Sequence, residues 1–266
     1  MSEPEKQEIE IATSKPIGLW EKIICRLRSP LASIPECKHL VSTRESIKYG
    51  FDSVSYRGIA ENLVLGVAYA VHSAVPGDIA EFGTHTGRTA RVISAAMRLY
   101  RANKELHLFD SFEGLPEATA GPDKENEHVK AGVWGQGSLV GISPEALRRQ
   151  CGKQIGESAV RIYKGWFSET LPKIPKGTKF SMIHIDSDLY LSAHEVLDFL
   201  IGHRMVSDGA MILFDDWQCN RASNEFGERR AWKEVVERHK VDAENMGCYG
   251  WAGHKFIVHG YTPQAK

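Results

Sequence analysis

The chain has 266 residues, of which 42% are hydrophobic and 25% are charged, and its formal net charge is −1. This composition is typical of a globular protein with one large α/β domain and an extension. Because a balanced charge creates no field that attracts a polyanion, we expect no nucleic acid partner. The five cysteines are scattered without a CxxC pair, which predicts reduced thiols in a cytoplasmic protein.

The N-terminal part of the chain is expected to be an appendage of the main domain. Residues 1–16 are acidic and polar, which predicts a disordered tail and neither a signal peptide nor a membrane span. Residues 17–75 are predicted to form a helical extension or cap. Within it, apolar residues recur at helical spacing over 17–27, which indicates a helix packed on the main domain or on a second subunit of a homo-oligomer. Basic residues beside this stripe leave a membrane-surface role as the alternative.

The rest of the extension predicts one strong helix after an irregular segment. Residues 30–57 have no clear period, and we expect a connection that covers the active site. Residues 61–74 are predicted to form the helix, which Pro76 and Gly77 end. The main domain then covers residues 76–266.

From Asp78 the pattern becomes strand, glycine turn and helix. Residues 79–82 predict a short buried strand, GTHTG at 83–87 the turn, and 88–101 the helix. Glycines let a ligand approach the backbone closely, and the following helix N-terminus offers free amides. A plain tight turn is the alternative. The next strand, 106–110, ends on Asp110, where doubly wound nucleotide-binding folds keep a carboxylate for ribose hydroxyls.

The glycine spacing argues against a nicotinamide cofactor, because the GxGxxG that seats a pyrophosphate is missing. Glu81 lies two residues before the first glycine. An acid at this position suits a cationic ligand with a ribose and an amino acid tail, which describes S-adenosylmethionine.

Two short apolar runs, 182–190 and 211–217, each stop on a pair of acids. Asp186 and Asp188 follow the first run, and Asp215 and Asp216 follow the second. A helical pattern between the runs predicts parallel strands joined by a crossover helix, so the four acids converge at the carboxyl edge of the sheet. Carboxylates this close raise one another's pKa unless a cation neutralises them. The alternative is that single acids cap the helices that follow.

The remaining segments complete an α/β pattern around a long insertion. Residues 111–142 are predicted to be either a mobile lid or a segment whose Trp134 and Gln136 contact adenine or substrate. Helices are predicted after Ser143, over 190–200 and from about residue 227, and a strand over 160–163. Residues 255–259 predict a final strand.

Five runs of sequence resemble the TylF/MycF family of macrocin-type, metal-dependent sugar O-methyltransferases. They are PGDIAEFGTHTGRTA (76–90), LFDSFEGLPE (108–117), KGWFSETLP (164–172), IDSDLYLSAHEVLDFL (185–200) and GAMILFDDW (209–217). The resemblance implies a class I methyltransferase fold, a Rossmann-like, doubly wound and mostly parallel sheet with an antiparallel last strand. It also implies S-adenosylmethionine as donor and magnesium at the acids, where all-oxygen donors suit this or another hard divalent cation.

Carried over residue by residue, the resemblance assigns roles to the positions that match. The residues expected to contact the cofactor are Glu81, Gly83, Thr84, Asp110, Ser111, Phe112 and Gln136. The expected metal ligands are Asp186, Asp215 and Asp216. Asp188 is expected to be the general base or a fourth ligand, so Asp188 and Asp186 are the candidate catalytic residues.

The function predicted from these observations is methyl transfer from S-adenosylmethionine to a hydroxyl of a small-molecule acceptor, expected to be a sugar of a natural product in secondary-metabolite biosynthesis. A divalent cation lowers the pKa of a bound hydroxyl, and a nearby carboxylate accepts its proton. Two alternatives stay open: an NAD-type oxidoreductase on the same sheet architecture, and a catalytically silent binding protein.

Overall fold

The computed structural model describes residues 30–35, 37 and 51–263. The predicted tail (1–16), the predicted helix (17–27) and residues 38–50 of the expected connection lie outside the described residues. None of the helices in the described part is long and apolar enough to cross a membrane.

Seven strands form one sheet in the order β3-β2-β1-β4-β5-β7-β6. They are β1 (Asp78–Phe82), β2 (Leu106–Asp110), β3 (Val160–Lys164), β4 (Phe180–Ile185), β5 (Val206–Phe214), β6 (Asp242–Tyr249) and β7 (Gly253–Gly260). β1 to β5 are mutually parallel, whereas β7 is antiparallel to both of its neighbours. The predicted fold class is confirmed, with the last strand as the reversed one.

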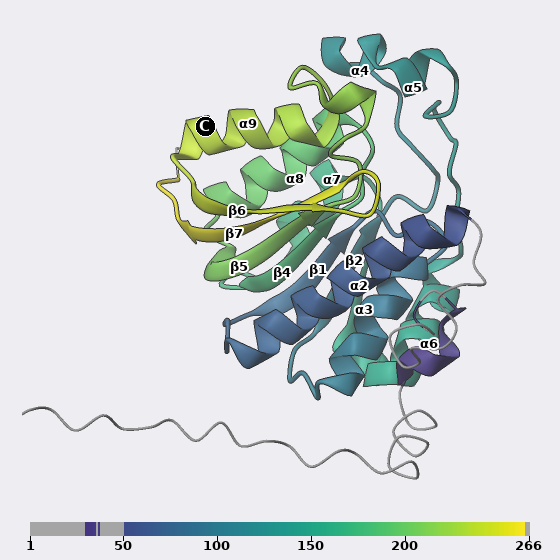
Figure 1. Cartoon of the computed structure of the whole chain (residues 1–266), viewed down its shortest axis with the longest axis vertical. Coiled ribbons are helices and arrows are strands. Elements are labelled where there is room, and N and C mark those ends of the chain that lie inside the picture. Colours follow the sequence, from purple (N-terminus) through teal and green to yellow (C-terminus); the bar gives the residue numbers. More distant parts are fainter. Residues whose placement is uncertain (1–29, 36, 38–50, 264–266) are drawn as a thin grey trace, which may run out of the picture.

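The helices cover both faces of this sheet. The longer ones are α2 (Phe51–His72), α3 (Arg88–Leu99), α6 (Pro144–Ile155), α8 (Tyr190–Gly202) and α9 (Gly227–His239), and the short ones are α4 (Gly121–Glu125), α5 (Glu127–Lys130) and α7 (Phe167–Thr170). Short 3-10 turns occur at Pro30–Ser33, Glu157–Ala159, Leu171–Lys173 and Asn220–Ala222. Figure 1 shows α2, α3 and α6 on one side of the sheet, α8 and α9 on the other, and α4 with α5 beyond the strand ends.

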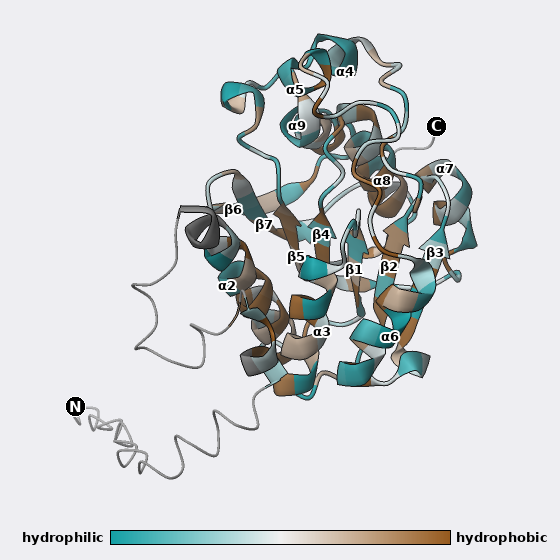
Figure 2. Cartoon of the chain, turned by 90° about the vertical axis from the view of Figure 1, so that its right-hand side faces the viewer, coloured by the Kyte–Doolittle hydropathy of each residue, from teal (hydrophilic) through white to brown (hydrophobic). Residues whose placement is uncertain are grey.

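Alternating side chains of each strand face two separate cores. In β1, Ile79 packs in the core under α2 and α3, whereas Ala80 and Phe82 pack in the core under α8 and α9. Both cores are apolar because a parallel sheet is covered on both faces, and Figure 2 shows the strands as a largely hydrophobic centre. The polar residues that do lie on these strands near their carboxyl ends therefore need a specific partner.

Two elements differ from the prediction. α2 begins at Phe51, ten residues before the predicted helix and inside the segment 30–57 that was expected to be irregular. Its start has no apolar period, and Gly58 allows the close approach of the β6–β7 turn, since a Cβ there would meet Gly250 Cα at 2.7 Å. β6 was missed because it is a largely exposed edge strand without apolar alternation. It forms through backbone pairing with β7.

α2 also packs on the main sheet, where Leu63, Val67 and Ala70 are fully buried. The division of the chain at residue 76 therefore separates segments that share one core. It stays a prediction, as does the role of the segment before α2.

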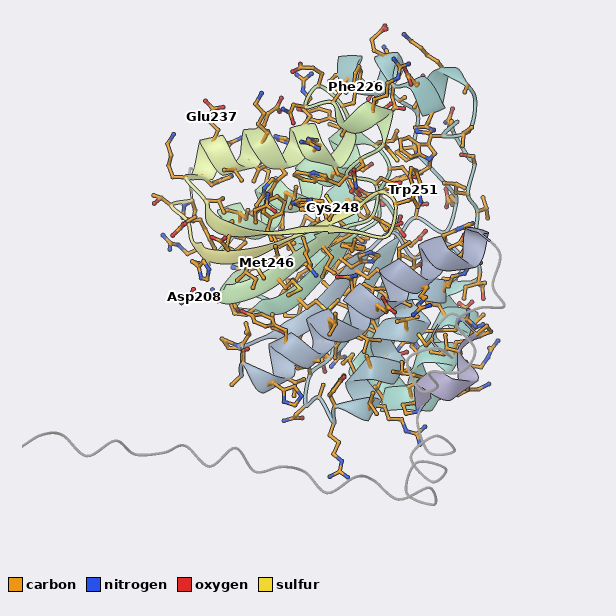
Figure 3. The ribbon with its side chains drawn as sticks, viewed as in Figure 1. Asp208, Phe226, Glu237, Met246, Cys248 and Trp251 are labelled. Atoms are coloured by element: carbon orange, nitrogen blue, oxygen red, sulfur yellow. The ribbon has the colours of Figure 1, made fainter. Side chains whose placement is uncertain are left out.

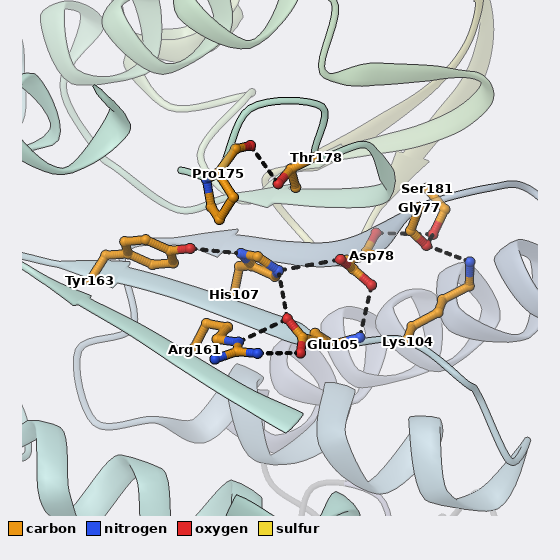
Figure 4. Close-up of polar contacts among 10 residues, drawn as sticks. All are labelled: Gly77, Asp78, Lys104, Glu105, His107, Arg161, Tyr163, Pro175, Thr178 and Ser181. Atoms are coloured by element: carbon orange, nitrogen blue, oxygen red, sulfur yellow. Dashed lines mark hydrogen bonds and ion pairs between the residues drawn. The ribbon is translucent and has the colours of Figure 1, made fainter. Parts of the chain in front are cut away.

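A charged network joins the amino ends of β1, β2 and β3 (Figure 4). The Nε2 of His107 lies 3.4 Å from Asp78 Oδ2 and 3.7 Å from Glu105 Oε2. Arg161 binds both oxygens of Glu105, at 2.8 and 2.6 Å. Although Asp78, Glu105 and His107 have the right atoms for a metal, the guanidinium already neutralises Glu105. We interpret this network as a structural contact that holds the amino ends of these three strands together. The site described next lies at the opposite, carboxyl ends.

Candidate active site

A cavity of about 470 Å³ opens at the carboxyl edge of the sheet. Four strand ends contribute to its wall: the glycine loop after β1, the turn after β2, the turn after β3 and the acid loop after β4. The 111–142 insertion closes it from outside with residues that include Leu115, Gln136 and Leu139. Six of the residues predicted to form the site line this cavity, namely Gly83, Asp110, Ser111, Gln136, Asp186 and Asp188.

Asp110 holds the glycine loop through its carboxylate. Oδ2 accepts hydrogen bonds from the Thr84 amide at 2.7 Å, the Thr84 hydroxyl at 3.0 Å and the His85 amide at 3.0 Å. Oδ1 accepts one from the Phe112 amide at 2.7 Å. The side chain therefore fixes the shape of the loop that was predicted to receive the cofactor. Since each carboxylate oxygen offers about two acceptor sites, Oδ1 retains capacity for one further donor.

Gly83 brings the glycine loop against the acid loop. Its φ is +88°, and a Cβ at this position would lie 1.7 Å from the carbonyl oxygen of Asp186. The Asp186 amide in turn donates to Phe82 O at 2.9 Å. Only glycine fits this conformation and this approach, so the predicted cofactor loop and the predicted metal loop share one backbone contact.

Three residues expected to touch the cofactor are placed elsewhere. Glu81 is fully buried within the sheet, and its Oε1 lies 2.9 Å from His184 Nδ1. The amide and hydroxyl of Thr84 are used by Asp110, and Phe112 packs against the core under α3. None of the three is among the described residues that line the cavity. For Glu81 the reason is strand alternation. Its side chain projects from one face of the sheet rather than beyond the end of the strand.

The acids of the two loops converge as predicted, in a slightly different combination. Ligand oxygens of Asp186, Asp188 and Asp216 all lie within 4.8 Å of one another. Asp215, the third ligand predicted from the sequence, turns its Oδ1 toward His184 Nε2, 3.8 Å away. Asp188 has a φ of +60°, a left-handed conformation that Asp tolerates better than most residues.

Burial and mutual repulsion favour protons on this cluster when no cation is bound. Burial, followed by the charges of Asp215 and Asp216, raises the pKa of Asp186 well above its usual value. The pKa of Asp188 is raised in the same way. Burial and then Asp215 raise the pKa of Asp216 to about 7. Asp215 is thus close enough to be the leading charge acting on both Asp186 and Asp216.

Glu228 ties the two acid loops together from the first turn of α9. Its side chain is fully buried, with Oε2 accepting from the Asp216 amide at 3.0 Å and Oε1 from the Ser187 amide at 3.4 Å. One carboxylate therefore sets the spacing of the loops after β4 and β5. Burial and the nearby Asp216 raise its pKa well above the usual value.

His184 connects the buried Glu81 to the acid cluster. It precedes Asp186 by two residues on β4 and is fully buried. Burial opposes its charged form, but the carboxylates of Asp215 and Glu81 outweigh this and raise the pKa of His184 to about 9. Glu81 Oε2, His184 Nε2 and Asp215 Oδ1 have no hydrogen-bond partner although they are buried. The cationic imidazolium compensates part of the negative charge at this edge.

The 111–142 insertion is fastened to both acid loops. The carboxylate of Asp123 accepts the amides of Tyr190 at 2.7 Å and Leu191 at 3.1 Å, which caps α8 directly after the acid loop. The amide of Glu127 donates to Asn220 Oδ1 at 3.1 Å, beyond the second acid loop. Trp134 packs in a small cluster with Leu189, Cys219 and Ala252. Trp134 was one of the residues expected to touch adenine or substrate, and here it anchors the insertion.

Sequence reasoning missed His184, Asp123 and Glu228 as parts of the site. His184 had a signal, because an ionisable residue inside the apolar run 182–185, two positions before an acid, requires a partner when it is buried. Asp123 and Glu228 had no such signal, because their hydrogen-bond partners are distant in the chain. The partners of Asp123 lie 67 and 68 positions away, and those of Glu228 lie 12 and 41 positions away.

Known proteins resemble this chain in sequence and in fold. Demethyldecarbamoylnovobiocin O-methyltransferase of Streptomyces niveus is 28% identical over 192 residues, 71% of each chain. The 8-demethyl-8-(2,3-dimethoxy-alpha-L-rhamnosyl)-tetracenomycin-C 4'-O-methyltransferase of Streptomyces olivaceus is 28% identical over 174 residues, 64% of this chain and 65% of that one. The solved structure of the O-methyltransferase NovP has a TM-score of 0.61 at 25% identity, and the match covers 76% of this chain and 79% of that one.

The sequence profile of one family spans the described core from within α2 to the end of β6. It matches residues 57–249, which include the glycine loop, Asp110 and both acid loops. This confirms the resemblance read from the five sequence runs. The chain belongs to the macrocin O-methyltransferase (TylF) family of enzymes.

Proposed function

We propose that this enzyme transfers the methyl group of S-adenosylmethionine to a hydroxyl of a sugar on a natural product. The observation that carries the proposal is the continuous cavity that reaches from the loop held by Asp110 to the carboxylates of Asp186 and Asp188. Family membership and the names of the relatives, one of which refers to a rhamnosyl group, support this choice of donor and acceptor over hydride transfer or silent binding.

The cofactor end of the cavity is assigned to Gly83, Asp110, Ser111 and Gln136. The free acceptor capacity of Asp110 Oδ1 suits a ribose hydroxyl, because its other bonds fix the carboxylate in place. Because Gly83 has no side chain, its backbone borders the cavity directly. Glu81 is not part of this end of the cavity, because its carboxylate lies 2.9 Å from His184 Nδ1 and suits a supporting role through that ring.

The acid cluster fits a divalent cation by its own chemistry. Its donors are carboxylate oxygens, which hard cations such as Mg²⁺ prefer, and burial together with the neighbouring carboxylates raises the pKa of several acids. The buried Asp215 Oδ1 has no hydrogen-bond partner, and it forms an ion pair with His184 Nε2 at 3.8 Å. Asp186 and Asp216 belong to both the predicted set and the observed set, so we assign them as ligands, with Asp215 or Asp188 as the third.

When bound there, Mg²⁺ would lower the pKa of an acceptor hydroxyl. The chain's own residues do the rest. Asp188 lines the cavity and accepts the hydroxyl proton, Glu228 holds the acid loops at a fixed spacing, and the insertion anchored by Asp123 and Trp134 keeps water from the reacting groups. The Gly83 contact places the cofactor loop beside Asp186, so that donor and acceptor meet with little loss of freedom.

The experiment is a methyl-transfer assay by mass spectrometry against a panel of glycosylated natural products, with calorimetry for S-adenosylmethionine. EDTA should stop turnover, and Mg²⁺ should restore it, while cofactor affinity changes little. Asp216→Asn should lose Mg²⁺ affinity, whereas Asp188→Asn should keep it and lose about 10²- to 10⁴-fold in rate if this residue is the base. Full activity in chelator would remove the metal from the proposal, and absence of cofactor binding would refute the methyl-transfer function.

Metal affinity in two variants separates the alternatives for Asp188 and Asp215. If Asp188→Asn loses the metal while Asp215→Asn keeps it, Asp188 is a ligand, as the observed grouping allows. The reverse result supports the assignment made from the family resemblance.

A further inference from the structure

The wall of the cavity is acidic, with one exception. Its carboxylic acids are Asp110, Glu117, Asp123, Asp186, Asp188 and Glu195. No Lys or Arg is among the described residues that line it, and His85 is the one described residue there whose side chain can carry a positive charge. Like charges repel each other most where protein shields them from water. An anionic group of a ligand is therefore compatible with the wall beside His85 and unfavourable along the rest of it.

The backbone of His85 is fixed from two sides. Its amide donates to Asp110 Oδ2 at 3.0 Å, and its carbonyl oxygen accepts from the Ile142 amide at 3.0 Å. A Cβ on Gly141 would lie 1.7 Å from that carbonyl oxygen, so the end of the 111–142 insertion packs directly on the glycine loop. These contacts hold His85 at a φ of +41°, in the left-handed region that His adopts more readily than most residues. The point at which the imidazole leaves the backbone is thus set by the fold.

The imidazole of His85 has no partner in the described part of the chain. The residue is exposed, and no hydrogen bond, ion pair or ring contact joins its ring to another described residue. By contrast, the rings of His107, His184 and His239 are buried and lie between 2.8 and 3.4 Å from a carboxylate oxygen. A neutral imidazole donates one N–H, and a protonated one donates two. Since both backbone polar groups of His85 are used, its ring is what the residue offers to a ligand.

The cofactor that the proposed function requires has one anionic group. In S-adenosylmethionine this is the α-carboxylate of the methionine tail, whereas the ammonium and sulfonium groups are cationic and the adenine and ribose are uncharged. We propose that His85 binds this α-carboxylate and so orients the methionine tail in the cavity, an inference that rests on the proposed function. The acidic rest of the wall suits the two cationic groups. Because the His85 amide is bonded to Asp110, to which the ribose is assigned, one loop holds two parts of the cofactor.

The test compares two ligands that differ only in this carboxylate. Calorimetric titration of the full chain measures the affinity for S-adenosylmethionine and for its decarboxylated form, in which a hydrogen atom replaces the carboxylate. Wild type should bind S-adenosylmethionine about 10- to 100-fold more tightly, which is the range of one hydrogen bond to a charged group. In His85→Ala this preference should disappear, because S-adenosylmethionine loses affinity while the decarboxylated form keeps the affinity that it has for wild type.

A second variant separates loss of the ring from loss of the loop. His85→Asn introduces a residue that tolerates the left-handed backbone and removes the imidazole, so it should lose the preference in the same way. The matched control is His259→Gln, an exposed histidine on β7 whose ion-pair partner Asp208 lies 4.0 Å away. Figure 3 shows Asp208 near the start of β5, at the end of that strand opposite to the acid loop. The control should keep both affinities of wild type.

Four results would overturn the proposal. They are an unchanged preference in either His85 variant, an equal loss of affinity for both ligands, a loss of the preference in the control, and a wild type that binds the two ligands equally. The second of these would show that His85 shapes the loop without binding the carboxylate. Failure of the proposed function gives a different result, since wild type would then bind neither ligand, and the role of His85 would fall with it.

Discussion

Replacing Asp110 by asparagine should loosen the glycine loop and lower both stability and cofactor affinity. The carboxylate accepts from four donors, three on Oδ2 and one on Oδ1. An amide has one oxygen and one NH₂ group. Whichever way the new side-chain amide turns, its NH₂ therefore faces at least one backbone N–H, and that N–H is left without an acceptor.

The smallest loss occurs when the amide oxygen faces Thr84 and His85, so that only the Phe112 amide is abandoned. One hydrogen bond to a charged group contributes about 1.5 to 3 kcal/mol, and the three that remain weaken because their acceptor is now neutral. We expect a total destabilisation of about 2 to 4 kcal/mol. For a protein of this size each kcal/mol lowers Tm by about 2 to 4 °C, so Tm should fall by about 4 to 16 °C.

The measurement is thermal unfolding of Asp110→Asn, with calorimetric titration of S-adenosylmethionine, where an affinity loss of about tenfold or more is expected because the cofactor must reorder the loop. The matched control is Asp208→Asn. The Asp208 side chain is 84% exposed and its ion-pair partner His259 lies 4.0 Å away, so a change within about 0.5 kcal/mol is expected. If Asp110→Asn unfolds at the same temperature as this control, the carboxylate does not hold the loop and the reasoning is wrong.

Three further predictions concern the acid loops and the insertion. Gly83→Ala should prevent the glycine loop from packing on Asp186, because the added Cβ would lie 1.7 Å from a carbonyl oxygen at a φ of +88°. Cofactor binding measured by calorimetry should then be lost, and retained binding would contradict the close contact. Asp123→Ala removes the cap of α8 and should lower the free energy of unfolding by about 1 to 2 kcal/mol. Limited proteolysis should then cut within residues 111–142 faster than in wild type. An unchanged cleavage pattern would show that the cap does not hold the insertion in place. In EDTA, Tm should decrease as pH rises from about 4 to about 7 and level off above that. The folded state raises the pKa of Asp216 to about 7, whereas the unfolded chain releases this proton near pH 4. The stabilisation is therefore complete below the unfolded value and lost above the folded one. Asp216→Asn should flatten this pH dependence, and a slope unchanged by the substitution would assign it to another group.

The sequence by itself determined the sheet and the edge at which the chemistry lies. Apolar runs such as 79–82 and 182–185 have the length and composition of buried strands, and the helical patterns between them require right-handed crossovers with parallel neighbours. Because parallel strands end at one edge, the residues that follow them, including Asp110, Asp186 and Asp216, were bound to converge. These features depend on periodicity and on local turn chemistry, which are written in neighbouring positions of the chain.

The tertiary structure decided what each of these side chains touches. Glu81 and Asp110 both looked like cofactor ligands in the sequence, but strand alternation sends Glu81 to His184 and leaves only Asp110 on the cavity. The grouping of Asp188 with Asp186 and Asp216 depends on the left-handed backbone at Asp188.

The supporting residues and the edge strand were also decided by contacts between distant segments. Glu228 becomes part of the site only because α9 starts beside two loops that precede it in the chain, and Asp123 because the insertion reaches the start of α8. β6 has no apolar alternation and exists because β7 offers it a hydrogen-bonding edge. Their partners lie many positions away in the chain, and no local pattern of residues records a hydrogen bond that forms only after the sheet has brought these segments together.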